Sequence, residues 1–565
     1  MLLSRFLPRT DFTSYEDFKQ NYRVAIPDNF NFAFDVVDEW AKTDAEKKAL
    51  VWCDDHGGEK TLTFREISLL SNKAANFFLH IGLKKGDAVM LILRRRWEFW
   101  VCAVALCKLG VVFIPASMQL THKDIAYRVN KANAKTILHV NDAFVNSQIA
   151  RALPDCPALK PTISVGAADF AQDSNPDVYR APIHFNTEIE RFSDEFLRPA
   201  GDGATKNEDV MFLYFTSGTT GMPKMVRHNY THPLGQIVTA KYWQQVRDGK
   251  LHMTVSDSGW AKFGWGKIYG QWICGAVIFA YDMDKFVAAK LLEKLEEYKV
   301  ATFCAPPTML RFMLLEDIKK YDLSSIAHCC IAGEPLNPEV FNQWRAMTGL
   351  KLYEGFGQTE SSVLIANFQW FKPKPGSMGK PSPLYDIDII DGDGNPCGDG
   401  DEGEIVVRNI DKGLPCGLFT GYYNDKALTE AVFANGNYNT GDVAWRDSDG
   451  YYWFVGRSDD VIKCSGYRIG PFEVESALIE HEAVIECAVT AAPDPTRGQV
   501  VKATVVLRKE FAPSDALKKE LQEHVKKVTA PYKYPRIIEF VDELPKTVSG
   551  KIKRAEIRAA NAAKE

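Results

Sequence analysis

The sequence lacks long apolar runs and any strong excess of charge. No stretch approaches the ~18 consecutive apolar residues of a bilayer-crossing helix, so we expect no membrane span. The formal net charge is only -5, which gives no reason to expect nucleic acid as a partner. The first nine residues hold two arginines but too short an apolar run for a secretory signal, and a weak organellar signal stays open.

The 12 cysteines lack the paired spacing of a metal site or a disulfide framework. Cys329 and Cys330 are adjacent within an apolar run, where cysteine behaves as a small core residue. This usage is typical of a reducing compartment. We therefore expect a cytoplasmic protein.

The chain of 565 residues is too long for one ordinary core, which predicts two or more domains. Helical and strand patterns alternate from Phe30 to Ala280, for example a helix over 64–81 followed by a strand over 88–93. Such alternation indicates α/β layers with mostly parallel sheets.

The pattern changes after Gly379 to short strands broken by turns, such as the turn at 391–396. This predicts a small β subdomain within a large N-terminal domain of several subdomains. The tail has strand and helix patterns of its own, so we place a boundary near Asp459 and expect domains 1–458 and 459–565. The second of these would be a small α+β C-terminal domain.

The sequence also lacks the Walker pattern GxxxxGK[ST], because Gly221 is followed by Met-Pro-Lys, and this excludes a P-loop NTPase. A different anion-binding loop follows an expected strand over 210–215. Backbone N–H groups freed by glycine, hydroxyls and a lysine are chemistry for a polyphosphate. A flexible Ser/Thr/Gly turn is the alternative for the loop alone. The loop consists of Thr216, Ser217, Gly218, Thr219, Thr220, Gly221, Met222, Pro223 and Lys224.

Later segments share an order and spacing with one superfamily. They are Gly333-Glu334-Pro335-Leu336-Asn337, Tyr353-Glu354-Gly355-Phe356-Gly357-Gln358-Thr359-Glu360, Asn439-Thr440-Gly441-Asp442, Gly456-Arg457 and Pro545-Lys546-Thr547-Val548-Ser549-Gly550-Lys551. With the first loop, they resemble the adenylate-forming superfamily of acyl-CoA synthetases, peptide-synthetase adenylation domains and luciferases. The resemblance spans about Phe30 to Arg558. Segments such as 465–471 and 529–536 look most like the medium-chain acyl-CoA synthetases.

The resemblance implies a site for ATP. Lys551 would bridge the acid carboxylate and the α-phosphate, because two anions must approach each other. Glu360 would hold Mg²⁺, and Thr216 and Lys224 would share catalysis with them. Asp442 would accept the ribose hydroxyls. The whole implied set is the loop Thr216 to Lys224 with Gly333, Glu334, Pro335, Glu354, Gly355, Phe356, Gly357, Gln358, Thr359, Asp442, Arg457 and Lys551.

For coenzyme A, the resemblance points to Ser465, Gly466, Tyr467, Arg497 and Lys526. Asp459 matches the hinge about which the C-terminal domain would turn between two half-reactions. For the basic residues Arg497 and Lys526, the alternative is that they only form part of a solvent-exposed face.

For the acid, the resemblance points to Trp260, Phe263, Trp265, Gly357 and Arg468. Gly357 stands where acetyl-CoA synthetases carry a tryptophan, which predicts a deeper pocket. The alternative is that the three aromatic residues are only core.

The expected protein is an AMP-forming acid:CoA ligase that uses ATP, Mg²⁺ and coenzyme A. Its substrate would be a short- to medium-chain carboxylic acid, with branched and aromatic acids as further candidates. A carrier-protein loading enzyme, a luciferase-like oxidase and a non-enzymatic sensor are the alternatives, because one fold hosts several functions. A homodimer is an open expectation.

Overall fold

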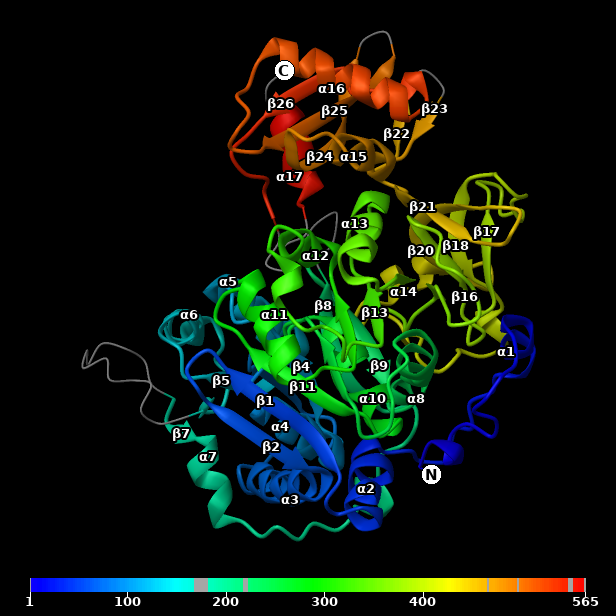
Figure 1. The fold of residues 1–565 in the computed structure, drawn as a ribbon. Helices are drawn as coiled ribbons and strands as arrows, with labels where there is room; N and C mark the ends of the chain where they lie inside the picture. The colour runs from blue at the N-terminus through cyan, green and yellow to red at the C-terminus, as the bar shows by residue number, and fades with distance from the viewer. Residues whose placement is uncertain are drawn as a thin grey trace.

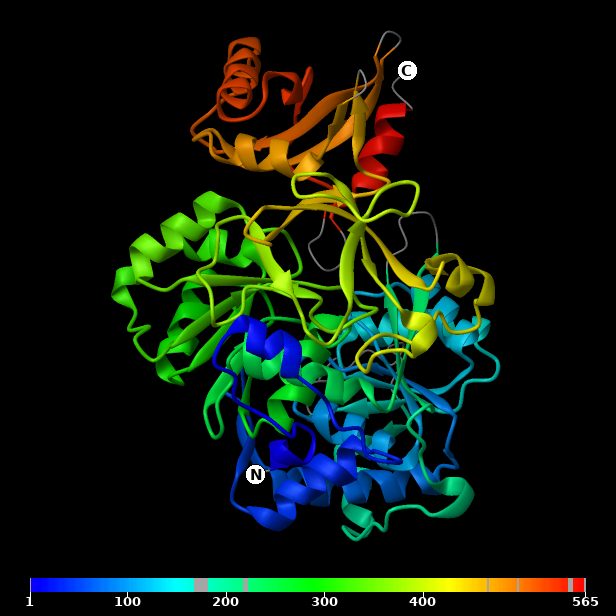
Figure 2. The same ribbon diagram turned by 90° about the vertical axis from the view of Figure 1, so that its right-hand side faces the viewer.

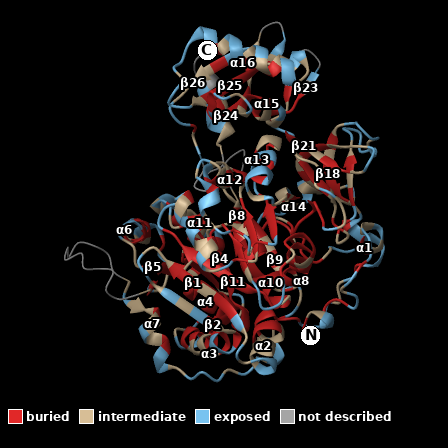
Figure 3. Ribbon diagram, viewed as in Figure 1, coloured by how far each residue is buried: buried red, intermediate tan, exposed pale blue. Residues whose placement is uncertain are grey.

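A computed structural model describes residues 2–166, 181–216, 222–464, 467–494, 497–546 and 552–562. Three sheets organise these residues (Figures 1 and 2). Buried residues, red in Figure 3, concentrate in the sheets and in the helices that cover them. The expected α/β class, with a large N-terminal part and a small C-terminal part, is confirmed. No helix in the described part of the chain is both long and apolar enough to cross a bilayer.

The first sheet has seven strands, which are parallel apart from the antiparallel β8–β9 pair. Its strands β3 and β4 are joined by α4 (Glu98–Leu109), a helix that is buried on every side and so lacks a polar face. In order across the sheet, the strands are β7 (Ile183–His184), β6 (Ile163–Val165), β5 (Ala134–Val140), β3 (Ala88–Ile92), β4 (Val112–Pro115), β8 (Val210–Thr216) and β9 (Lys224–Asn229).

The second sheet combines two kinds of pairing. Its parallel half is β14 (Leu352–Phe356), β13 (His328–Ile331), β12 (Thr302–Ala305), β10 (Leu251–Thr254), β11 (Val277–Asp282) and β1 (Lys48–Asp54), with β2 (Glu59–Thr63) antiparallel at the edge. Its antiparallel half is β15 (Ile365–Ala366), β16 (Ser377–Pro381), β21 (Tyr452–Arg457), β20 (Asn437–Arg446), β19 (Phe433–Ala434), β18 (Gly403–Val407) and β17 (Ile387–Ile390). The expected β subdomain is therefore present, but hydrogen bonding through β14, β15 and β16 makes it continuous with the parallel half.

The third sheet is built entirely from residues after Val461 and has its own buried core. In Figures 1 and 2 this part, orange to red, lies above the rest of the molecule. Its strands are β23 (Tyr467–Ile469), β22 (Ile462–Cys464), β25 (Gly498–Leu507), β24 (Val484–Asp494) and β26 (Ile537–Phe540). Its helices are α15 (Pro471–Ile479), α16 (Asp515–Val528) and α17 (Arg554–Ala562).

The remaining helices cover the first two sheets or cap their ends. Helix α3 starts with a capping box in which Thr63 and Glu66 satisfy each other's backbone N–H groups. These helices are α1 (Tyr15–Asn21), α2 (Asp38–Thr43), α3 (Phe64–His80), α5 (His122–Ala132), α6 (Ala143–Ala152), α7 (Phe185–Glu188), α8 (His232–Ile237), α9 (Ala261–Lys267), α10 (Tyr269–Ile273), α11 (Ala288–Glu297), α12 (Pro307–Met313), α13 (Pro338–Thr348) and α14 (Lys426–Val432).

Candidate active site

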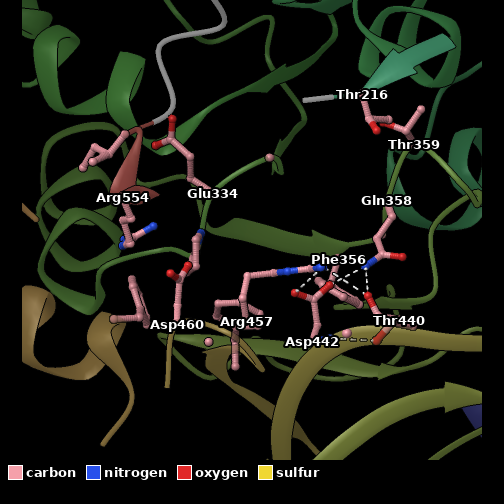
Figure 4. A pocket seen from close by; sticks show the side chains of 18 of the residues that line it. Thr216, Glu334, Phe356, Gln358, Thr359, Thr440, Asp442, Arg457, Asp460 and Arg554 are labelled. Carbon is pink, nitrogen blue, oxygen red and sulfur yellow. Dashed lines mark hydrogen bonds and ion pairs between the residues drawn. The ribbon is translucent and has the colours of Figure 1, made fainter. Parts of the chain in front are cut away.

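A cavity of about 860 Å³ lies where the ends of β8, β13 and β14 meet the antiparallel strands and the C-terminal part. Figure 4 shows side chains that line it. Residues from both sides of position 459 contribute to the lining, for example Thr216 and Arg554. The cavity is therefore shared between the two parts of the chain.

The phosphate-loop prediction concerns one end of this cavity. Thr216 ends β8, Lys224 begins β9, and the two residues are register partners that both line the cavity. The Lys224 ammonium lies 5.4 Å from the centre of the Tyr422 ring. Met222 is 62% exposed, and the Pro223 carbonyl accepts a hydrogen bond from Tyr127. The predicted residues Ser217, Gly218, Thr219, Thr220 and Gly221 lie outside the described residues.

Glu360 lies beside this end of the cavity. The Tyr422 hydroxyl donates to Glu360 Oε1 at 2.9 Å. Burial raises the pKa of Glu360, although the Tyr422 hydrogen bond and the charges of Arg457 and Lys224 lower it. Within the described ranges, no group of three or more His, Cys, Asp or Glu side chains could hold a metal by itself. One carboxylate and the Thr216 hydroxyl fit the hard-oxygen ligation of Mg²⁺, which takes its remaining ligands from water and substrate phosphates.

Asp442, on β20, is buried and held from two sides (Figure 4). Arg457 Nη1 donates to Asp442 Oδ1 at 3.3 Å and to the Thr440 carbonyl at 3.1 Å. Gln358 Nε2 donates to the same carbonyl at 2.8 Å and to Asp442 Oδ2, while Tyr438 donates to the Gln358 carbonyl oxygen. This network fixes a carboxylate in the cavity wall, as binding of paired hydroxyls requires.

Glu354 faces the cavity. Its Oε1 accepts the Leu336 N–H at 3.3 Å, and among the residues that the structure describes its buried Oε2 has neither a hydrogen-bond partner nor a cationic one. Burial raises the pKa of Glu354 to about 8. A neutral carboxyl group here can both donate and accept, which suits the edge of a nucleobase. Gly333, with φ of 103°, and Glu334 and Pro335 line the same side.

The aromatic residues predicted to line an acyl pocket have different positions. Trp260 lines the cavity, whereas Phe263 is fully buried, with its ring centre 4.9 Å from that of Phe99. The role of Phe263 in an acyl pocket stays a prediction. A Cβ atom on Gly357 would lie 2.4 Å from the Trp265 ring. The Trp265 ring therefore lies directly against Gly357.

The residues predicted for coenzyme A do not line the cavity where the structure describes them. Tyr467 is 51% exposed and stacks on Tyr532 with ring centres 4.2 Å apart. Lys526 Nζ lies 2.6 Å from Glu523, and Arg497 lies 3.9 Å from Asp494. Ser465, Gly466, Lys551 and the Arg468 side chain lie outside the described residues. Asp459 follows β21 and lies 3.9 Å from Arg457.

Sequence reasoning missed many lining residues, among them Tyr422, Tyr438, Glu475 and Arg554. Tyr422 stands in no matched segment, whereas Tyr438 directly precedes the segment 439–442. Glu475 and Arg554 stand shortly after the matched segments at 465–471 and 545–551, so extending those segments by a few residues would have included them.

The fold and the cavity define a class: two-domain enzymes that bind a nucleotide between a large α/β part and a small C-terminal part. The chain belongs to the AMP-binding enzyme family, whose model matches residues 37–423 and whose C-terminal domain model matches residues 473–551.

Comparisons with known proteins agree with this assignment. The chain is 42% identical to the mouse acyl-coenzyme A synthetase ACSM3, mitochondrial, over 97% of this chain and 93% of that protein. It is 44% identical to human ACSM4, and the match covers 94% of this chain and 91% of that protein. The solved anthranilate CoA ligase AuaEII, in complex with anthranoyl-AMP, is 28% identical with a TM-score of 0.85, covering 95% of this chain and 98% of that one.

A solved benzoate CoA ligase from Burkholderia xenovorans LB400 is 27% identical with a TM-score of 0.79. The match covers 94% of this chain and 100% of that one. The chain is therefore an ATP-dependent acid:CoA ligase, an acyl-CoA synthetase. The comparisons therefore support the ligase over the carrier-protein, luciferase-like and sensor alternatives.

Proposed function

We propose that this ligase activates a small branched or aromatic carboxylic acid in two half-reactions that share one cavity. The acid and ATP first form an acyl-adenylate and pyrophosphate, and coenzyme A then takes the acyl group and releases AMP. The observation that carries this proposal is the convergence of Thr216, Lys224, Glu360, Asp442 and Trp260 on one cavity. Hydroxyl, ammonium and carboxylate groups there suit a nucleotide, and the indole suits an acyl group.

Each polar group has a proposed role. Asp442, held by Arg457 and Gln358, binds the ribose hydroxyls of ATP and of the adenylate. Thr216 and Lys224 bind the phosphates, and Lys551 brings the carboxylate and the α-phosphate together by offsetting their repulsion. Glu360 would hold Mg²⁺, which neutralises phosphate charge when bound.

We also propose that Asp459 is the hinge and the boundary between domains 1–458 and 459–565. The separate core of the third sheet supports this, since no core residue of that part precedes Ile462 among the described residues. In the described arrangement, Tyr467, Arg497 and Lys526 lie away from the cavity. If they bind coenzyme A, the C-terminal domain must turn to bring them toward the acyl-adenylate.

The preference for a small acid follows from Trp265. Its ring lies against Gly357, which lines the cavity, and we infer that a medium-length chain would meet the ring there. Solved relatives named for anthranilate and benzoate, two compact aromatic acids, support the same size class. Chains of six carbons or more require Trp265 to move, so we assign them to the weak end of the range.

The direct test measures pyrophosphate release with ATP, Mg²⁺, coenzyme A and a panel of straight, branched and aromatic acids. Isobutyrate, 2-methylbutyrate or benzoate should give the highest kcat/KM. A maximum at octanoate or longer would refute the small-acid assignment.

Replacing Trp265 with alanine sharpens this test. The change should raise the kcat/KM ratio of hexanoate to butyrate about tenfold or more, because each added methylene gains ~1 kcal/mol or more in an apolar pocket. Phe263→Leu, in the neighbouring core, serves as the control and should leave the ratio unchanged. An unaltered ratio in a folded Trp265 variant would show that the indole does not limit the chain length.

Compartment and assembly remain predictions. The names of the relatives place them in mitochondria, which favours the open organellar alternative over the expected cytoplasm. Cell fractionation decides between them, and light scattering of the purified protein decides whether it is a homodimer.

A further inference from the structure

Arg554 and Glu475 form an ion pair in the cavity wall contributed by the C-terminal domain (Figure 4 labels Arg554). Arg554 Nη2 donates to both Glu475 oxygens at 2.7 Å. Glu475 is held in turn by the Val489 N–H, which donates to its Oε1 at 2.8 Å. The Glu475 side chain is 8% exposed. Burying a charged pair is costly, and apolar side chains would serve packing as well.

The position of Arg554 in the chain links this pair to the adenylating segment. Lys546 and Ile552 form an antiparallel bridge, and the Lys553 N–H donates to the Pro545 carbonyl at 2.8 Å. Arg554 follows directly as the first residue of α17. Lys551 is three residues earlier in the sequence.

Arg554 also faces the large domain across the cavity. In Figure 4 its guanidinium lies on the same side as Glu334, in the loop after β13. Glu475, and more weakly Glu334, raise the pKa of Arg554, so the arginine stays charged. Nearby, Asn337 Nδ2 donates to the Ser476 carbonyl at 3.2 Å between the two domains. The arginine thus stands between a carboxylate of its own domain and one of the other.

We propose that Arg554, held by Glu475, is a positioning residue for the acyl-adenylate-forming half-reaction. The pair fixes the start of α17, and with it the adjoining bridge between Lys546 and Ile552, on the wall of the cavity formed by the C-terminal domain. The proposal rests on the proposed role of Lys551. Because the thioester-forming arrangement uses another face of the C-terminal domain, Arg554 has no positioning role there.

The test replaces Arg554 with methionine and measures the half-reactions separately. Acyl-adenylate formation should fall about tenfold to a hundredfold in kcat, since a small misplacement of a reacting group has an effect of this size. The KM for ATP should change by less than about twofold, because no nucleotide-binding group is removed. Thioester formation from supplied acyl-adenylate should keep its rate. Equal loss in both half-reactions, or no loss in either, overturns the proposal.

A double variant separates positioning from simple stability. Arg554→Met leaves Glu475 buried without its partner, whereas Arg554→Met with Glu475→Met removes both charges and should recover thermal stability. Adenylate formation should remain low in the double variant. If it returns together with stability, the pair is only structural and the proposal fails. The double variant also decides the question should the single variant not fold.

Lys553→Met is the matched control. Lys553 is adjacent to Arg554, but it forms an exposed ion pair with Glu556 at 2.6 Å and does not line the cavity. Such pairs contribute little, so both half-reactions should be unchanged. The outcomes remain distinct from those of the proposed function. If wild-type protein releases no pyrophosphate with any acid, the function fails, whereas a selective defect can be read only in an active enzyme.

Discussion

The two walls of the cavity differ in how firmly they are fixed. In the wall formed by the large domain, Asp442 is held by Arg457 and Gln358, and both donors also bind the Thr440 carbonyl. The wall formed by the C-terminal domain meets the large domain where α15 packs against β21, and its polar contacts there include the Asn337–Ser476 hydrogen bond and the facing charges of Arg554 and Glu334. We call the first wall the fixed wall and the second, which the proposed domain rotation would withdraw, the exchangeable wall.

This difference suits a reaction in two steps. The adenosine part of the substrate stays bound through both steps. Its binding is therefore favoured by donors and acceptors that are already held in place before the substrate arrives. The group that assists adenylate formation is needed only once. A wall with few polar contacts across the domain boundary can be withdrawn at low cost after that step.

We expect the largest effect from a substitution in the segment that belongs to the exchangeable wall. Lys551→Ala should reduce acyl-adenylate formation by roughly a thousandfold, because a charge contact made in the transition state is lost. Thioester formation from supplied acyl-adenylate should continue. Rapid-quench assays of each half-reaction measure both rates. If the two fall together in a folded variant, Lys551 does not belong to an exchangeable wall.

The next largest effect is expected from a substitution in the fixed wall. Asp442→Ala should lower both half-reactions by about a hundredfold, because ATP and the adenylate share the same ribose contacts and Arg457 loses one of its carboxylate partners. The KM for ATP should rise as well. Steady-state kinetics and isothermal titration with ATP provide the measurement. A defect confined to one half-reaction would contradict a wall common to both.

A smaller effect concerns the connection between the walls. Asp459→Pro fixes φ at the proposed hinge and removes an N–H. Thioester formation should fall about tenfold while adenylate formation persists, provided that the chain is locked in the adenylating arrangement. Proline at Asp425, an N-cap residue of α14 outside the hinge, tests whether any proline has this result. Identical profiles for the two variants would argue against a hinge at Asp459.

The smallest expected effect is on the unfolding free energy, and it concerns Glu354 in the fixed wall. Burial raises the pKa of Glu354 from 4.5 to about 8. Between these values the folded protein holds a proton that the unfolded chain has released, so this group's contribution to the unfolding free energy falls as pH rises through the window, by at most about 1.4 kcal/mol per pH unit. Glu354→Gln removes that slope.

Urea unfolding at pH 6 and pH 8 without ligand is the measurement. Wild-type protein should lose more stability than Glu354→Gln over this interval. Glu430→Gln, an exposed change on α14, should behave like wild type. Parallel losses in wild type and Glu354→Gln would show that Glu354 is already ionised at pH 6.

Most of the scaffold could be predicted from the sequence, because apolar periodicity determines strands and helices locally. The strand expected over 210–215 is β8 (Val210–Thr216), and the helix expected over 64–81 is α3 (Phe64–His80). The glycine- and proline-rich motifs marked the loops that line the cavity.

The contacts that the sequence does not reveal depend on packing between distant segments. Trp260, Phe263 and Trp265 are close in sequence, and their pattern does not reveal that Phe263 packs on Phe99 while Trp265 covers Gly357. The Arg554–Glu475 pair joins residues 79 positions apart, so no local pattern marks it. Such contacts are properties of the folded chain, and only a structure supplies them.

The edge of the second sheet has a consequence for synthesis on the ribosome. Strand β1 (Lys48–Asp54) pairs with β11 (Val277–Asp282), and Asp55 accepts the Tyr281 hydroxyl across 226 residues of chain. At about 5–20 residues per second, the nascent β1–β2 hairpin waits ~10–50 s for its partner. All strands of the first sheet are made in that interval. A nascent chain arrested before residue 277 therefore exposes an apolar strand edge, and we expect it to be a preferred client of ribosome-associated chaperones.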